Sequence, residues 1–271
     1  MSNLTKEDIQ GLPCKGHQDD GDALLWGSLT YASGLDVGRG IELCESDSGQ
    51  VFRSPARADK SKQGVIELNA FSRDMATGFT LAAAASCYKY KDSRVLEAYE
   101  RWVEYTLNNG CRACKDTDGR CIMTPALYWM ASYAGASNVP AAYAVTRWFL
   151  KPYLLIAAMV NEPGFTLHLV SVTLFMLQIH YGGYDRSPFL VKQACRSLHR
   201  RQPKNAFFAV LANQKDKARS SLEEVKSYID ANGQGIKNQW CWERSDEEQA
   251  HKDSCGWDVD FIENLLKDQQ S

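Results

Sequence analysis

Acidic side chains cluster just before the first apolar segment of this chain. Asp19, Asp20 and Asp22 stand in the sequence DDGDALLW, and Asp74 stands at the start of a second apolar segment, in FSRDM. Two carboxyl groups flanking a glycosidic bond can hydrolyse it, because one protonates the leaving oxygen while the other activates water or attacks carbon. Crowded carboxylates raise the pKa of one member, as a general acid requires. The candidate catalytic residues are therefore Asp20, Asp22 and Asp74, with Asp20 or Asp22 paired with Asp74 or Asp258.

Further polar and aromatic residues stand close to expected helix starts. An arginine can bind an acidic sugar or a carboxylate through its planar fork of donors. Flat aromatic rings with a polar edge suit stacking on sugars, and the chain has seven tryptophans. The candidate substrate-binding residues are His17, Trp26, Arg73, His168, Trp257 and Asp258.

Each of these residues also has a purely structural interpretation. Acids in the first turn of a helix cap free N–H groups and stabilise the helix dipole, which would account for residues 19–22. Arg73 and Asp74 can form an ordinary cap and ion pair. His168 lies in an apolar run, where a hydrogen-bonded core histidine is common, and His17 suits a hydrogen bond within a loop.

Two patterns resemble parts of metal sites. Cys111, Cys114 and Cys121 are closely spaced, but zinc requires four ligands, and no fourth ligand or nearby histidine follows. Free thiols or one disulfide are favoured. The segment 116–119 begins like a calcium loop but lacks the later oxygen ligands and the closing glutamate, which favours an Asx turn. We expect no cofactor.

Composition restricts the class of partner. The 271 residues carry a net charge of −2 without a long basic run, which argues against nucleic acid or an anionic membrane as the main partner. The polar N-terminus has no apolar signal core. The longest apolar run, residues 165–179, is shorter than the roughly 20 residues of a membrane span. We expect a cytoplasmic protein, with release by lysis or signal-independent export left open, and mostly reduced, buried cysteines.

Apolar helices are expected to begin near residues 20, 71, 124, 165, 205 and 256, with more polar helices between most of them. The pattern predicts an N-cap at Asp19 or Asp20, a long irregular loop at about 35–69, a helix interruption at Pro152, and an extended segment at 240–244. Strand signals are few. The sequence has no residue-level repeat, but the spacing of these starts, roughly 40 to 53 residues, is typical of stacked helical hairpins. The fold class is therefore all-α, as a single domain over residues 1–271.

An inner ring of apolar helices and an outer ring of amphipathic helices would satisfy this pattern. All inner helices would then run in the same direction, so that their N-termini gather at one end of the molecule. We expect the candidate site residues, from Asp20 to Asp258, to converge at that end.

This helix rhythm, with carboxylates and tryptophans at the starts of the apolar helices, resembles the carbohydrate-active enzymes built as an (α/α) toroid. These are glycoside hydrolases and polysaccharide lyases with about six helical hairpins. The resemblance implies an (α/α) toroid or partial toroid, since the chain is short for a complete one. It also implies a glycan-cleaving enzyme that acts on a bacterial envelope or capsular polysaccharide. The segments HQDDGD, FSRDM and CGWD resemble segments of uncharacterised phage or prophage proteins.

Three alternatives remain open. Cleavage by β-elimination would need a Tyr or His base and an Arg neutraliser in place of a carboxylate pair. A non-catalytic helical protein that binds a partner or a glycan would pair the acids of residues 19–22 locally and present them to no pocket. A metal-dependent hydrolase would use His17 with Asp19, Asp20 and Asp22, but the sequence offers no second group of ligands.

Overall fold

The computed structural model describes residues 8–14, 20–65, 70–113, 121–232, 240–243 and 254–268, without the side chain of Asp268. Most of these residues are helical, and the only sheet among them is a two-stranded antiparallel hairpin of β1 (Asp8–Ile9) and β2 (Leu12–Pro13). The all-α prediction is confirmed. None of the helices described is long and apolar enough to cross a membrane.

The six expected apolar helices are present, each starting within three residues of its predicted position. They are α1 (Ala23–Ser33), α4 (Arg73–Ala84), α6 (Pro125–Ala134), α9 (Phe165–Tyr181), α11 (Ala206–Leu211) and α13 (Trp257–Asp268). Local signals define their ends. Ser72, Thr124 and Asn205 accept hydrogen bonds from the free N–H groups of the following turn. Glycines in the left-handed conformation end α1, α6 and α9.

The other helices stand between them in the chain, and all of these except α8 are more polar or shorter. They are α2 (Gly38–Glu42), α3 (Pro55–Lys62), α5 (Ser93–Asn108), α7 (Ala141–Thr146), α8 (Leu150–Val160), α10 (Phe189–Arg201) and α12 (Lys215–Asn232). A π-helical segment, η1 (Ala85–Tyr90), continues α4, and two short 3₁₀ turns are η2 (Arg147–Phe149) and η3 (Cys241–Glu243).

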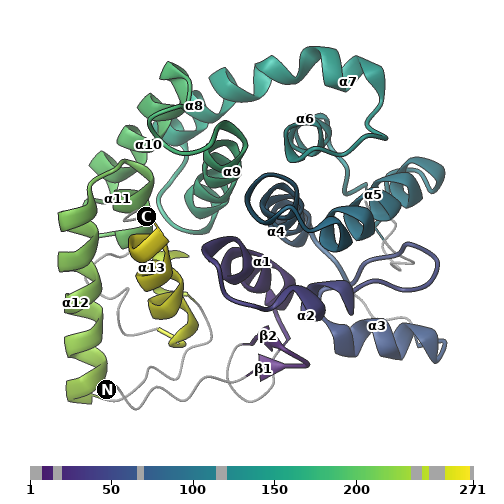
Figure 1. The fold of residues 1–271 in the computed structure, drawn as a ribbon, viewed down its shortest axis with the longest axis horizontal. Coiled ribbons are helices and arrows are strands. Elements are labelled where there is room, and N and C mark those ends of the chain that lie inside the picture. The colour runs from purple at the N-terminus through teal and green to yellow at the C-terminus, as the bar shows by residue number, and fades with distance from the viewer. Residues whose placement is uncertain are drawn as a thin grey trace.

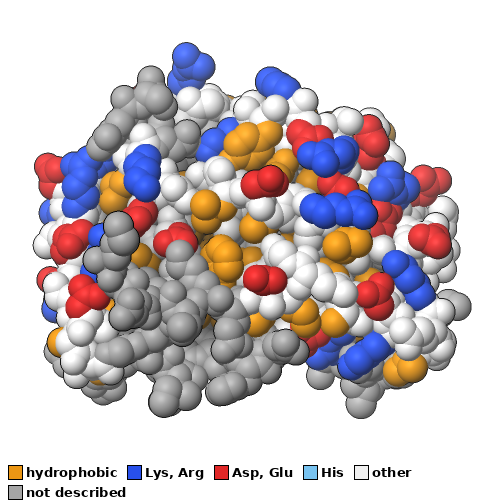
Figure 2. Space-filling view, turned by 60° about the horizontal axis from the view of Figure 1, so that its bottom comes forward, with side chains coloured by type: hydrophobic (Ala, Val, Ile, Leu, Met, Phe, Trp, Pro, Cys, Tyr) orange, Lys and Arg blue, Asp and Glu red, His pale blue; other side chains and the backbone are white. Residues whose placement is uncertain are grey.

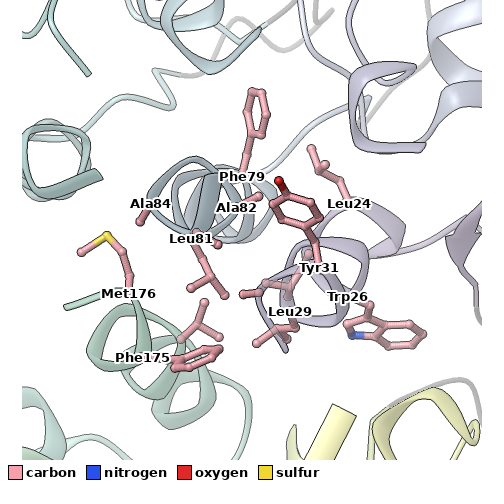
Figure 3. Packing of buried hydrophobic residues seen from close by; sticks show 14 of the residues in the cluster. Leu24, Trp26, Leu29, Tyr31, Phe79, Leu81, Ala82, Ala84, Phe175 and Met176 are labelled. Atoms are coloured by element: carbon pink, nitrogen blue, oxygen red, sulfur yellow. The ribbon is translucent and has the colours of Figure 1, made fainter. Parts of the chain in front are cut away.

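The six apolar helices contact one another in chain order. Each of α1, α4, α6, α9, α11 and α13 packs against the next, α13 packs against α1, and α4 also contacts α9 (Figure 1). In Figure 3, Leu81 of α4 and Leu29 of α1 extend from their helices toward Phe175 of α9. Gly78 makes the close approach of α1 and α4 possible, because a Cβ there would stand 2.7 Å from the Cα of Leu25.

These helices run in the same direction. At one end, Tyr90 of η1 donates to the carbonyl of Tyr31 near the end of α1. At the same end, the Tyr88 ring meets the His180 ring near the end of α9. Gln178 donates to the carbonyl of Leu211, where α11 ends. The starts of the helices therefore gather at the opposite end.

Several local predictions are wrong. Residues 35–69 are not simply a loop, because Ser54 caps α3 and Pro55 occupies its first turn, where no N–H is needed. The N-cap of α1 is Asp22, in the left-handed conformation, without a side-chain cap. The interruption before α8 falls at η2, and Pro152 fits within the first turn of α8. Residues 241–243 form η3 and not an extended segment, because buried partners hold each of them.

The cysteine loop contains one of the two arrangements left open by the sequence. Cys111 is disulfide-bonded to Cys121, whereas Cys114 lies outside the described residues. The described cysteines outside this disulfide are Cys14, Cys44, Cys87, Cys195, Cys241 and Cys255, and all of them except Cys87 are buried.

Candidate functional site

Glu243 lies at the centre of the gathered helix starts. Its Oε1 accepts a hydrogen bond of 2.9 Å from the indole N–H of Trp26, in the first turn of α1. The same oxygen lies 3.3 Å from Nε2 of His168, in the first turn of α9. Trp26 and His168 are both completely buried, and the side chain of Glu243 is 1% exposed. The structure thus brings two of the predicted site residues together, inside the molecule.

Burial controls the charge of this cluster. Removing His168 from water lowers its pKa to about 3, because the charged imidazolium loses its hydration. His168 is therefore neutral near pH 7, and its contact with Glu243 is not an ion pair there. Neither ring nitrogen makes a hydrogen bond to any described group. Trp26 holds Glu243 more directly than His168 does.

Residues 240–243 fill the space between the helix starts. The Trp240 ring stacks on Trp26 at 5.8 Å between centroids and meets Phe261 of α13 at 5.1 Å. Asn205, the cap of α11, donates to the carbonyl of Trp242 at 3.0 Å. This segment therefore joins α1, α9, α11 and α13 at one end of the molecule.

Asp258 anchors the same segment. Its carboxylate accepts hydrogen bonds from Cys241 N–H at 2.9 Å, Ser254 Oγ at 2.6 Å and its neighbour Val259 N–H at 3.0 Å. Burial raises the pKa of Asp258, although these hydrogen bonds oppose the rise. Both oxygens are engaged and the residue is completely buried, so the structure gives Asp258 a role in holding the segment. Trp257 beside it is partly exposed.

Asp22 and Asp74 form a second, more accessible group. Arg53 links the starts of α1 and α4 through its backbone, which accepts from Leu24 N–H and donates to the Ala70 carbonyl. Its guanidinium lies 3.7 Å from Asp22. Burial and then the negative charge of Asp22 raise the pKa of Asp74, against the opposing effects of Ser72, Arg53 and Arg73. The carboxyl groups of Asp22 and Asp74 therefore interact electrostatically.

Asp20 is engaged differently from its neighbours. Arg57 of α3 donates to both of its oxygens, at 2.6 and 3.0 Å, and Ser54 Oγ donates at 2.7 Å. Burial alone would raise the pKa of Asp20, but these hydrogen bonds and the charges of Arg57 and Arg53 outweigh it and lower the pKa. Asp20 therefore stays ionised and attaches α3 to the start of α1.

Of the remaining candidates, Arg73 stands beside Asp74 in the first turn of α4, and the others lie outside the described residues. Arg73 is exposed, and its guanidinium contacts the carbonyl of Cys121 at 3.5 Å. His17 and Asp19 are not among the described residues. No group of three or more His, Cys, Asp or Glu side chains suited to a metal ion occurs within the described ranges.

Sequence reasoning missed Glu243, Arg53 and Arg57. Glu243 follows two closely spaced tryptophans in WCWE, and an acid among large apolar residues is a signal of a buried, partnered carboxylate. Arg53 and Arg57 had no such signal, because arginines are frequent in exposed segments. Their roles depend on contacts with distant parts of the chain.

A cavity of about 610 Å³ lies at the other end of the same helices. Tyr88, Phe175, Gln178, Arg186 and Leu265 are among its lining residues. None of the predicted site residues that the structure describes lines this cavity. Comparison with models of known families, with curated proteins and with solved structures finds no match for this chain.

Proposed function

We propose that the protein hydrolyses a glycan with Asp74 as proton donor and Asp22 as the base or nucleophile. The observation that carries this proposal is the half-buried Asp22–Asp74 pair, in which burial and the charge of Asp22 raise the pKa of Asp74. A general acid must hold its proton near the working pH while its partner stays ionised. The guanidinium of Arg53 lies 3.7 Å from the carboxyl group of Asp22.

The arrangement of the helices supports the proposal at a larger scale. The six apolar helices contact one another in chain order, α13 returns to α1, and their starts lie at the same end. We infer an (α/α) toroid in which α4 and α9 touch across the middle. Residues 240–243 fill the central part of the end that bears the pair, and we propose that the substrate binds beside them, at the starts of α1 and α4.

The proposed substrate is a polysaccharide of a bacterial envelope or capsule. Arg73 is exposed in the first turn of α4, beside Asp74, and its planar fork suits the carboxylate of an acidic sugar. Trp257 is the partly exposed tryptophan among the predicted sugar-binding residues. Trp26, His168 and Asp258 would support this site from within and would not contact the glycan.

The test is the release of reducing ends from a panel of bacterial polysaccharides and peptidoglycan. We expect Asp74→Asn and Asp22→Asn to lower the rate about 100-fold or more, because each removes one partner of the acid–base pair. For the wild type, the rate should fall as the pH rises through the raised pKa of Asp74, since the donor then loses its proton.

Asp216→Asn is the matched control. Asp216 also occupies the first turn of a helix, α12, but is fully exposed on its side chain and pairs with Arg219. This variant should retain full activity. If the wild type releases no product from any glycan, or if the Asp74→Asn variant is as active as the Asp216→Asn variant, the proposal is wrong. Unsaturated products would indicate β-elimination instead.

A second candidate function is non-catalytic binding of a partner or a glycan, as in an accessory protein of phage or prophage origin. The specific observation in its favour is the pairing of Asp20 with Arg57, since local pairing of residues 19–22 is what this alternative expects. The complete burial of Trp26 and His168 also suits a structural role. Saturable glycan binding without product release would favour this function.

A further inference from the structure

The helical segment from α7 to α8 carries a row of exposed apolar side chains. We call it the α8 stripe, and its residues are Val145, Trp148, Phe149, Tyr153, Ile156, Met159 and Val160. Their exposed fractions run from 42% to 75%. They recur every three or four residues, with adjacent pairs at 148–149 and 159–160, so that they share one side of the helical segment. In Figure 1 this segment lies at the rim of the molecule.

The opposite side of α8 is also apolar. Leu150, Leu154, Ala157 and Ala158 are buried, and α8 packs against α10, α9 and α6. A helix that is apolar on all sides belongs inside a protein. Helix α8 therefore has the composition of a buried helix, while its outer side is uncovered in the single chain.

The exposed area matches one side of a protein interface. A large side chain that is about half exposed presents roughly 100 Å², so the seven residues of the α8 stripe together expose several hundred Å². A standard interface buries about 800 Å² on each partner. Single monomers rarely expose an apolar patch as large as the α8 stripe unless it has a function.

The area and the composition of the α8 stripe favour a second copy of the same chain. Residues 141–160 contain no acid, so two copies of the stripe can meet without burying a carboxylate. Two copies of α8 packed antiparallel about Ile156 would bring the two Ile156 side chains together and Tyr153 opposite Met159. Antiparallel helix dipoles also attract.

A membrane surface fits α8 less well. Interfacial helices carry many cations on a polar side opposite their apolar side. The side of α8 opposite the stripe is apolar and packed against the protein, and Lys151 is the cation of α8 itself. We propose that the α8 stripe is the contact surface of a two-fold symmetric dimer, formed by antiparallel packing of α8 against α8 of a second copy.

Sedimentation velocity of the full chain over a concentration series tests this proposal. We expect a dimer for the wild type. Ile156→Glu should weaken dimerisation by more than about 100-fold, because two charges would be buried at the symmetry axis. Its fold should persist, since Ile156 is 60% exposed in the single chain. The matched control Leu107→Glu, at a 41% exposed position on α5, should leave the dimer intact.

A wild type that is monomeric at every concentration would overturn the proposal, as would a dimer that survives Ile156→Glu. A monomer that sediments with anionic phospholipid vesicles and loses this property in Ile156→Glu would assign the α8 stripe to a membrane surface instead.

Discussion

Burial determines the protonation state of His168. Its ordinary pKa of 6.5 falls to about 3 in the folded protein because the ring is removed from water. Between these two values the unfolded chain binds a proton that the folded chain does not. The free energy of unfolding must therefore decrease as the pH falls through this window, by up to about 1.4 kcal/mol per pH unit for this one group.

We expect His168→Gln to reduce this acid sensitivity. The amide stays uncharged at every pH, so the variant should lose less stability than the wild type between pH 6.5 and pH 4. Urea unfolding followed by circular dichroism across this range gives the two curves, and the difference at pH 8, where histidine is neutral in both states, gives the baseline cost of the substitution. If the free energies of unfolding of wild type and variant change in parallel with pH, the lowered pKa of His168 is contradicted.

Contacts between individual side chains were the least predictable feature of the sequence. The sequence predicted that Trp26, His168 and Asp258 lie near helix starts. It did not predict whether the space between those helix starts is open to solvent or occupied by another segment. The filling segment contacts Trp26 across 217 positions of the chain, and no local pattern encodes such a pairing. The ion pair between Asp20 and Arg57 could not be predicted either, because Arg57 belongs to a helix that lacks a clear apolar period.

The close approach of α1 and α4 makes Gly78 a sensitive position at the scale of elements. In an exposed helix, Gly→Ala stabilises by up to about 1 kcal/mol. At Gly78, however, the new Cβ would stand 2.7 Å from the backbone of Leu25. The two helices would have to separate, so we expect Gly78→Ala to destabilise the protein by about 1–3 kcal/mol.

Gly27→Ala is the matched control, measured in the same urea titration. Its new Cβ would meet the Cδ2 atom of Leu12 at 2.5 Å, which is the end of a flexible side chain and not backbone. We expect a smaller loss of stability for Gly27→Ala than for Gly78→Ala. Equal losses, or a gain for Gly78→Ala, would show that α1 and α4 do not rely on a small residue here.

Elements were more predictable than side-chain contacts because their signals are local. Ser72, Thr124 and Pro125 sit within one turn of the helix starts that they define, and Gly182 ends the helix that it follows. The prediction failed at α3, where a proline and a serine start a short polar helix without an apolar period. It also failed at η3, whose conformation depends on distant buried partners.

At the scale of the whole molecule, residues 240–243 tie the first helix to the last. On the face in Figure 2, Lys and Arg side chains lie among Asp and Glu side chains, so no single-sign field dominates that face. Cohesion of the fold comes instead from apolar burial and from contacts such as Trp240 with Trp26 and Phe261. These contacts join the start of the chain to its end and predict one cooperative unit.

Trp242→Ala tests that cooperativity. Trp242 is 2% exposed, its indole N–H donates to the Asp258 carbonyl at 3.0 Å, and its own carbonyl accepts from Asn205. We expect a loss of about 3–5 kcal/mol, and about 1 kcal/mol for the control Trp242→Phe, which mainly removes one hydrogen bond. Because α1, α9, α11 and α13 all contact this segment, calorimetry should show a single transition moved to lower temperature. An early partial transition that leaves a second one at the wild-type temperature would divide the chain into two units and contradict the single domain.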